Sequence, residues 1–369
     1  MSLVYKFGGS TIRSATALRM IADIIVNSLD LKFVVVSATY NSTNELEEIA
    51  RASVKSLCNA KDLISSFLFK HEALAKELDV LSFCKDHFAQ LRNEAEEYSK
   101  RINEDLEVRP ILMDGLYSLG ERFSSIILYS YIKNHLHHHY VDHLDAREVI
   151  VTNDRFRDAT PLFGFIEKRV ASLDPSKVYI TQGFIGKTLA GDTTTLGREG
   201  SDYTASILAW ALRASRLVIW KDVGGILSWD PKIYDGAFKL KNISYDEATL
   251  LTENGAKVLF HRTMNPLKER SIPLEVKGVY SPHEHGSIIS SASHGKILGV
   301  VEQKSIEYSK LSICGHDLIE NQAIIELIKI EEAALDEFSN QVVAFKVNLQ
   351  KRDDLLAQIV ALVSLSFDS

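Results

Sequence analysis

The chain opens with the stretch Leu3-Val4-Tyr5-Lys6-Phe7-Gly8-Gly9, in which a short apolar run ends at two glycines. Apolar residues then recur at helical spacing, as Leu18, Ile21 and Ile25, and residues 33–36 form a second apolar run. A strand, a glycine loop, a helix and a buried strand make a βαβ unit, and such units build parallel sheets. The opening therefore predicts an α/β fold.

Later patterns extend this sheet and then change character. We expect a mainly helical region over residues 45–131, interrupted near Pro110, and a helix over residues 203–213. The sequence Ser244-Tyr245-Asp246-Glu247 is a capping box, which predicts a helix that closes near Gly255. Further strands are expected at residues 178–180, 217–220 and 274–280.

A stretch rich in Ser, His and Gly, residues 290–295, marks a boundary between domains. Beyond it the patterns predict strands at 297–301, 311–314 and 342–347 and helices at 323–338 and 353–363. That order indicates one small α+β module of the ferredoxin-like type. We therefore expect one domain over residues 1–292 and a second over residues 293–369.

Composition limits the class of protein. The formal charge of -7 over 369 residues gives no basic surface for nucleic acid or for an anionic membrane. No apolar run reaches the length of about 18 residues that a membrane span needs. The three cysteines are far apart and the first residues resemble a strand, not a signal peptide. We expect a cytoplasmic protein.

Two polar loops carry the candidate chemistry. In Lys6-Phe7-Gly8-Gly9, bare backbone N–H groups beside a lysine suit a polyanion, although such a turn by itself is more often only a turn. The second loop, residues 193–203, contains three threonines, two glycines and Arg198. Ser201 or Asp202 could serve there simply as a helix N-cap. Because a cap needs one such residue, the density of this loop favours a binding site.

Taken together, these loops resemble the aspartokinase branch of the amino acid kinase family, over residues 4–289. The segments that carry the resemblance are 6–9, 37–38, 43–44, 120–121, 152–156, 181–184, 193–203, 221–223 and 255–259. The resemblance implies a three-layer α/β fold with a mostly parallel central sheet, followed by an ACT-type α+β module. Aspartokinases commonly carry two such modules, so the module here is reduced or truncated.

The resemblance also implies a reaction and the residues that perform it. The γ-phosphate of ATP, carried with Mg²⁺, would pass to the β-carboxylate of L-aspartate, the first step of the lysine, threonine and methionine routes. Catalytic roles would fall to Lys6, Asp202 and Lys257, and aspartate binding to Thr43, Glu121, Arg198 and Ser201. ATP would contact Lys6, Phe7, Gly8, Gly9, Lys221, Asp222, Leu227, Lys232, Lys257 and Val258. No protein side chain is predicted to bind the metal, a homodimer is expected, and lysine is a candidate effector.

Elementary chemistry supports these roles. A guanidinium such as Arg198 can grip an α-carboxylate with two hydrogen bonds, and Glu121 can hold an ammonium group. The β-carboxylate, with an ordinary pKa of about 3.9, is ionised at neutral pH and needs no general base. Departures from the family pattern occur at Glu199, Lys221, Leu227 and Lys232. Glu199 could pair with Arg198 and weaken its grip on substrate.

Two other functions fit the same residues. A catalytically silent amino-acid sensor would keep the ligand pocket, but it would not need the phosphate-binding residues Lys6, Asp202 and Lys257. A kinase for glutamate or another small acid is the other alternative, because Arg198 and Glu121 do not distinguish aspartate from glutamate.

Overall fold

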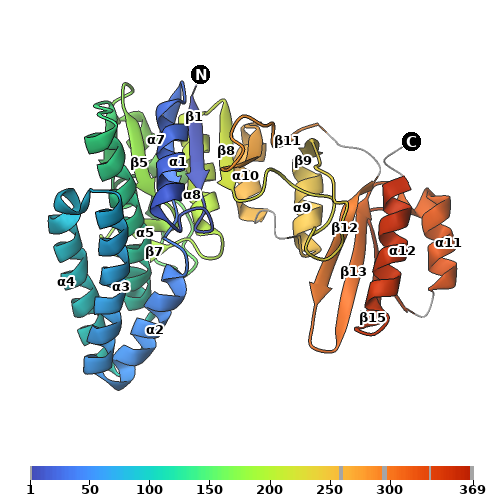
Figure 1. Cartoon of the computed structure of the whole chain (residues 1–369), viewed down its shortest axis with the longest axis horizontal. Helices are drawn as coiled ribbons and strands as arrows, with labels where there is room; N and C mark the ends of the chain where they lie inside the picture. Colours follow the sequence, from blue (N-terminus) through green and yellow to red (C-terminus); the bar gives the residue numbers. More distant parts are fainter. Residues whose placement is uncertain (1, 257–260, 293–296, 332–333, 366–369) are drawn as a thin grey trace. The chain divides into compact units, whose positions relative to one another are not determined.

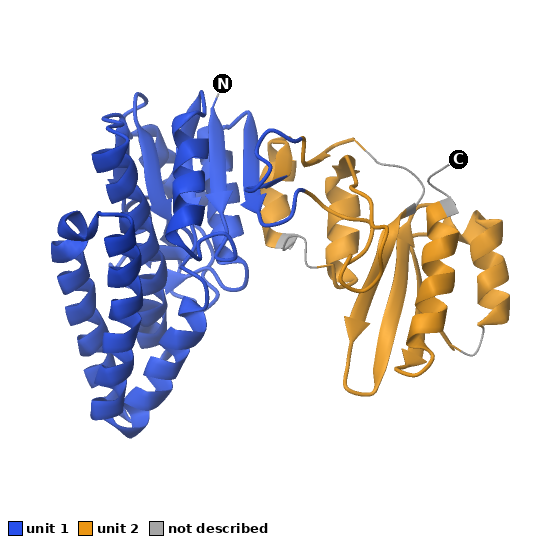
Figure 2. Ribbon diagram, viewed as in Figure 1, with its two compact units in different colours: residues 1–224, 277–284 blue, residues 225–276, 285–369 orange. Residues whose placement is uncertain are grey.

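The computed structural model describes residues 2–256, 261–292, 297–331 and 334–365. The chain forms two compact units (Figure 2). Unit 1 consists of residues 1–224 and 277–284, and unit 2 of residues 225–276 and 285–369. These units are defined by how closely the parts of the chain pack together. The division between a catalytic and a regulatory domain near residue 292 stays a prediction.

Five parallel strands form the centre of unit 1, in the order β3-β5-β2-β1-β8. The strands are β1 (Leu3–Phe7), β2 (Leu31–Val36), β3 (Val141–Leu144), β5 (Val178–Gln182) and β8 (Arg216–Lys221). A smaller sheet contains β4 (Val151–Thr152), β6 (Ile185–Thr188) and β7 (Thr193–Thr195). The predicted parallel α/β fold is confirmed.

Helices cover both faces of the parallel sheet. The helices of unit 1 are α1 (Ala15–Val26), α2 (Ser42–Lys55), α3 (Leu57–Glu77), α4 (Leu81–Asp105), α5 (Pro110–His135), α6 (Ala146–Val149), α7 (Phe163–Ala171) and α8 (Gly200–Leu212). Tyr5 and Phe7 of β1 are buried in the same core as α1 and α5. Successive side chains of a strand point to opposite faces, so Val4 and Lys6 face the other layer, where α8 contacts β1.

Four long helices, α2 to α5, pack side by side and account for the helical region predicted over residues 45–131 (Figure 1). The predicted interruption is also present, because α4 ends at Asp105 and Leu106 takes a left-handed conformation. Pro110 is the first residue of α5, a position that suits proline because the N–H it lacks has no partner there. None of the described helices is both long and apolar enough to cross a membrane.

Unit 2 contains strands of two sheets. In the first, β10 (Leu274–Gly278) pairs antiparallel with β11 (Ser287–Ser290), which pairs parallel with β9 (Asn242–Ser244). Helices α9 (Tyr245–Glu253) and α10 (His261–Glu269) belong to this part. Ser244 and Glu247 form the predicted capping box at the start of α9. Gly255, just after this helix, has a φ of +106° and completes the predicted stop.

The second sheet of unit 2 is antiparallel, with the order β12-β13-β15-β14. Its elements are β12 (Ile297–Lys304), β13 (Tyr308–Gly315), α11 (Gln322–Ile330), β14 (Leu335–Phe338), β15 (Val342–Asn348) and α12 (Arg352–Leu365). From β13 to α12 the order βαββα is that of a ferredoxin-like unit, and β12 precedes it as an edge strand. The predicted α+β module is confirmed.

One predicted helix is wrong in its second half. The pattern indicated a helix over residues 323–338, but α11 ends at Ile330 and residues 335–338 form β14. Leu335 pairs with Phe345, and Phe338 with Val343, of the neighbouring strand β15. Backbone pairing with a strand that is close in space therefore overrides a local helical periodicity.

Candidate active site

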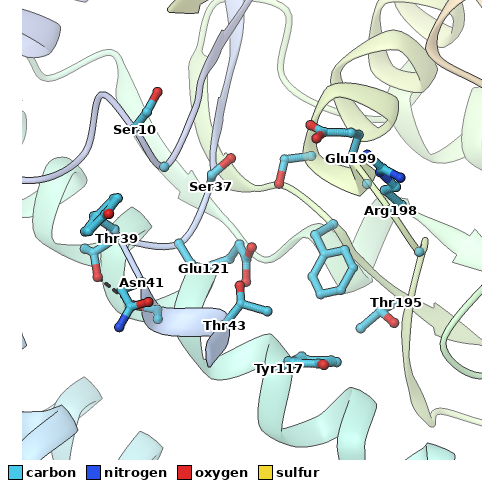
Figure 3. Close-up of a pocket in the computed structure, with 18 of the residues that line it drawn as sticks. Ser10, Ser37, Thr39, Asn41, Thr43, Tyr117, Glu121, Thr195, Arg198 and Glu199 are labelled. Atoms are coloured by element: carbon cyan, nitrogen blue, oxygen red, sulfur yellow. Dashed lines mark hydrogen bonds between the residues drawn. The ribbon is translucent and has the colours of Figure 1, made fainter. Parts of the chain in front are cut away.

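The candidate site lies in unit 1, at the carboxyl ends of the parallel strands. Gly8-Gly9 follow β1, the segment from Ser37 follows β2, and Gly183 follows β5. In open α/β sheets, ligands bind outside this edge. A cavity of about 510 Å³ opens there (Figure 3). Six of the predicted site residues line it: Lys6, Gly9, Thr43, Glu121, Arg198 and Ser201.

Lys6 and Asp202 form an ion pair at the wall of this cavity. The Lys6 Nζ atom lies 2.5 Å from Oδ1 of Asp202, and both side chains are almost completely buried. The pair exists because alternation along β1 directs Lys6 toward α8, whose first turn carries Asp202. A buried carboxylate beside an ammonium group fixes the direction of that group. Asp202 therefore fixes the direction of the Lys6 ammonium group.

Two helices begin at the cavity. Residues Asn41 and Glu199, the N-caps of α2 and α8, both have left-handed backbones and neither caps its helix with its side chain. Uncapped N–H groups and the positive end of a helix dipole attract anions. The alternative in which Ser201 or Asp202 is the N-cap does not hold, because the N-cap is Glu199 and α8 begins at Gly200, one residue before Ser201.

The sequence suggested that the glycine loop leads directly into a helix, but it does not. Helix α1 begins at Ala15 and is capped by the side chain of Ser14, which accepts a hydrogen bond from the N–H of Ala17. A tight turn separates it from the loop, in which the Thr11 hydroxyl donates to the Gly8 carbonyl at 2.6 Å. The positive helix ends at this site therefore belong to α2 and α8.

Glu121 projects from α5 and is 6% exposed. Burial raises the pKa of its carboxyl group to about 8, although a backbone hydrogen bond from Ala38 and the charge of Lys6 oppose that rise. An ammonium group bound beside Glu121 would favour the ionised form and reverse the effect of burial. Glu121 therefore suits a cationic ligand.

Arg198 is exposed on the opposite segment of the cavity wall. It makes no ion pair with Glu199 or with any other described residue. The predicted competition from Glu199 is therefore absent in this structure, and the guanidinium keeps its hydrogen-bond donors for a ligand. Gly197, just before it, has a φ of +78°, and a Cβ there would lie 2.8 Å from the Asp158 carboxylate.

The residues predicted to contact ATP do not all lie at this cavity. The Phe7 side chain is fully buried and stacks on Trp220, so only its backbone could reach a ligand. Lys221 is the last residue of β8, the strand beside β1, and the exposed Asp222 follows it and lies 3.7 Å from Arg13. Leu227 and Lys232 belong to unit 2. Lys257 and Val258 lie outside the described residues.

One functional candidate that the sequence analysis missed is Asp114, on α5. Its buried carboxylate accepts hydrogen bonds from the backbone N–H groups of Arg157 and Thr195 and from the Thr195 hydroxyl, at 2.7 to 3.2 Å. Arg157 and Thr195 both line the cavity. The only signal for Asp114 in the sequence is an acidic residue inside the apolar run 111–116.

A second network supports the segment that carries Thr43. The buried His71 of α3 bonds to the Phe67 carbonyl through Nδ1 and to the Thr39 hydroxyl through Nε2, at 2.8 and 3.0 Å. Burial lowers the pKa of His71 to about 3, so the ring is neutral. Thr39 in turn lies 2.7 Å from the Ser42 hydroxyl, which also accepts a bond from Lys70. This chain of hydrogen bonds ties residues 39–42 to α3.

The described residues contain no group of three His, Cys, Asp or Glu side chains that could hold a metal ion. A Mg²⁺ ion usually keeps several waters and binds through substrate phosphates with one or two carboxylates. Asp202 is already paired with Lys6.

Comparison with known proteins identifies the family. A sequence profile described as the amino acid kinase family matches residues 1–278. The chain belongs to the amino acid kinase family. Within it, the chain is 33% identical over 292 residues to Escherichia coli lysine-sensitive aspartokinase 3 and 29% identical over 380 residues to an aspartokinase of Chlamydia pneumoniae. These alignments cover 78% and 99% of this chain, but 64% and 82% of the two relatives.

Solved structures of the amino acid kinase family agree with this fold. E. coli aspartokinase III in complex with aspartate and ADP superposes with a TM-score of 0.84 at 23% identity, over 98% of this chain and all of that one. The complex of aspartokinase III with lysine and aspartate gives 0.76 at 27% identity, over 98% of this chain and 83% of that one. The chain spans just under two thirds of the length of the E. coli aspartokinase 3 sequence.

Proposed function

We propose that this protein is an aspartate kinase, which transfers the γ-phosphate of ATP to the β-carboxylate of L-aspartate. The observation that carries the proposal is the cavity that combines the Lys6–Asp202 pair with a buried acid, Glu121, and the guanidinium of Arg198, which pairs with no described residue. These are the groups that a phosphate donor and an α-amino acid need. Relatives named aspartokinase and the 27% identical structure with lysine and aspartate support the choice of substrate.

In this proposal the two ends of the amino acid are held by opposite charges. Arg198 binds the α-carboxylate through two hydrogen bonds, and Glu121 binds the ammonium group. Thr43 and Ser201, at the first turns of α2 and α8, add hydroxyl groups at the same cavity. The β-carboxylate is then left to face the side of the cavity formed by Lys6 and Gly9.

Phosphoryl transfer then needs alignment and charge neutralisation more than proton transfer. An oxygen of the β-carboxylate forms a bond to the γ-phosphorus, the bond from that phosphorus to the bridging oxygen breaks, and ADP leaves. Lys6, held by Asp202, and the positive ends of α2 and α8 offset the negative charge. Mg²⁺ carried with ATP would supply further positive charge.

The remaining roles are part of the same proposal. The ATP contacts are Phe7 through its backbone, Gly8, Gly9, Lys221, Asp222, Leu227, Lys232, Lys257 and Val258, and Lys257 assists catalysis. The α+β module serves as an ACT-type regulatory region that responds to an amino acid such as lysine, in a cytoplasmic homodimer. The 27% identical structure of E. coli aspartokinase III with lysine supports this choice of effector.

The test is to trap the acyl phosphate with hydroxylamine while aspartate, glutamate and other small acids are offered with Mg-ATP. Formation of aspartyl hydroxamate is the expected result. Turnover of glutamate alone would show a kinase for another acid. Absence of turnover together with intact binding of aspartate would instead show a silent amino-acid sensor.

A further inference from the structure

Arg157 lies at the cavity in a conformation that local sequence does not favour. It is a non-glycine residue with a φ of +73°, between β4 and α7. A left-handed backbone costs a residue with a Cβ about 1 kcal/mol or more, and it persists where the surroundings impose it. Here the surroundings are the Asp114 carboxylate, which accepts the Arg157 N–H.

The Arg157 side chain is fixed against the cavity wall. Its guanidinium carbon lies 4.9 Å from the centre of the Tyr117 ring, and one nitrogen donates to the Tyr117 hydroxyl at 3.3 Å. The Tyr117 hydroxyl itself donates to Glu47 at 2.5 Å. A stacked guanidinium held at one corner has a set orientation.

Most of the donors of this guanidinium are unused. Arg122 and Arg147 each pair with a carboxylate, whereas Arg157 makes no ion pair with a described residue. A guanidinium offers five N–H donors, of which one is used by Tyr117. An oriented cation with free donors at a concave site suits a carboxylate ligand.

Arg157 and Arg198 are carried by backbone segments that are locked together. Asp114 accepts from the N–H of Arg157 and from the N–H and hydroxyl of Thr195, three residues before Arg198. A Cβ on Gly197 would lie 3.3 Å from the Arg157 carbonyl oxygen. The backbone segments that carry these two guanidinium groups, neither of which pairs with a carboxylate of a described residue, are therefore joined through Asp114 in one wall of the cavity.

That wall lies away from the glycine loop. Figure 3 draws Tyr117, on which Arg157 stacks, at the edge of the pocket far from Ser10, the residue that follows Gly9. An anion at Arg157 is therefore distant from the loop proposed to hold the phosphates. Of the two carboxylates of the substrate, the one that does not react fits this place.

We propose that Arg157 is a second substrate-binding residue, which holds the α-carboxylate of the amino-acid substrate together with Arg198, and that Asp114 positions it. The two oxygens of a carboxylate have four lone pairs, enough for two guanidinium groups. The proposal rests on the proposed function for the identity of the substrate. It assigns specificity for an α-carboxylate to two arginines in place of one.

The experiment compares L-aspartate with its α-carboxamide, which keeps the reacting β-carboxylate and loses the charge that Arg157 would bind. Wild type and Arg157→Gln are assayed with both substrates. Arg157→Asn is a second variant, because Asn tolerates a left-handed backbone, and thermal melts check that each variant folds. Arg92→Gln is the matched control, since Arg92 pairs with Glu96 on the surface of α4.

Loss of charge-assisted hydrogen bonds predicts a KM for aspartate about tenfold to a hundredfold higher in Arg157→Gln, with the KM for ATP unchanged. Wild type should strongly prefer aspartate over the α-carboxamide, and this preference should shrink by a similar factor in both Arg157 variants. An unchanged preference in folded variants would overturn the proposal. Arg92→Gln should match wild type.

Failure of the proposed function has a different signature. If wild type forms no acyl phosphate from aspartate, both ligands are titrated calorimetrically into wild type and Arg157→Gln with a non-hydrolysable ATP analogue. Loss of the preference for aspartate in the variant would still support the role of Arg157. An equal preference in both proteins, or no binding to wild type, would overturn it.

Discussion

The raised pKa of Glu121 predicts that aspartate binds more tightly as the pH rises toward 8. Only the ionised carboxylate can pair with the substrate ammonium. With a pKa of about 8, roughly a tenth of the free protein has an ionised Glu121 at pH 7, and about a hundredth at pH 6. As the pH rises, the dissociation constant for aspartate should therefore fall about tenfold per pH unit up to about pH 7.5 and level off above pH 8.

Binding should also release a proton. When aspartate pairs with Glu121 at pH 7, nearly one proton should leave the protein for each ligand bound, because most Glu121 side chains are protonated beforehand. Isothermal titration calorimetry in two buffers that differ in ionisation enthalpy measures this number directly. A non-hydrolysable ATP analogue is present throughout, so that no turnover interferes.

The variant Glu121→Gln should bind aspartate weakly at every pH and release no proton. The exposed residue Glu48 provides a control, since Glu48→Gln should keep the wild-type pH dependence. An affinity of wild type that stays constant between pH 6 and 8, without proton release, would refute the role of Glu121 as the partner of the ammonium group.

Three further predictions follow from buried contacts. Lys6→Met should lower kcat at least a hundredfold and destabilise the fold by about 3–5 kcal/mol, because Asp202 stays buried without its partner. In urea unfolding, the double variant Lys6→Met/Asp202→Leu should regain stability, but it should not regain activity. Equal stability of Lys6→Met and wild type would contradict this prediction. In Gly183→Ala the new Cβ would lie 2.5 Å from Cβ of Ser201 and would shift the first turn of α8, so kinase activity should fall. Gly164→Ala is the control, because a Cβ at Gly164 would have no atom within 4 Å, and its activity should match wild type. Wild-type activity of Gly183→Ala would argue against a fixed position of the first turn of α8. His71 has a pKa of about 3 in the folded protein, below its ordinary 6.5, so the unfolded chain binds an extra proton and the free energy of unfolding should fall as the pH drops below 6.5. In urea unfolding, His71→Gln should lose less stability with falling pH than wild type, and His87→Gln should lose as much as wild type. The same loss in all three proteins would exclude His71 as a cause of the pH dependence.

Elements whose signals are local could be predicted from the sequence. The strand Leu3–Phe7 and the capping box at Ser244 depend on neighbouring residues alone, and both appear as expected. The helix predicted to continue to Phe338 failed because its last part pairs with β15, which follows it in the chain. The strand β14, with the sequence Leu-Asp-Glu-Phe, fits a polar helix as well as a strand when its partner is unknown.

The candidate site divides in the same way. Lys6, Glu121 and Arg198 occur in motifs that the family resemblance could identify, and the fold brings them to one cavity. Asp114 and Arg157 could not be found this way. Asp114 acts through residues 43 and 81 positions away, and the left-handed backbone of Arg157 leaves no glycine or asparagine as a sign in the sequence.

Helix α5 holds four side chains of this site in a single row. Asp114, Tyr117, Glu121 and Ser124 follow at intervals of three or four residues, so they share one face of the helix, and Ser124 donates to the Ser37 carbonyl at 2.6 Å. Inserting or deleting one residue between them would rotate part of the row by about 100°. Loops around the cavity can change length during evolution, but this helix can adapt only by substitution. The positions of the other pocket residues are therefore fixed relative to α5.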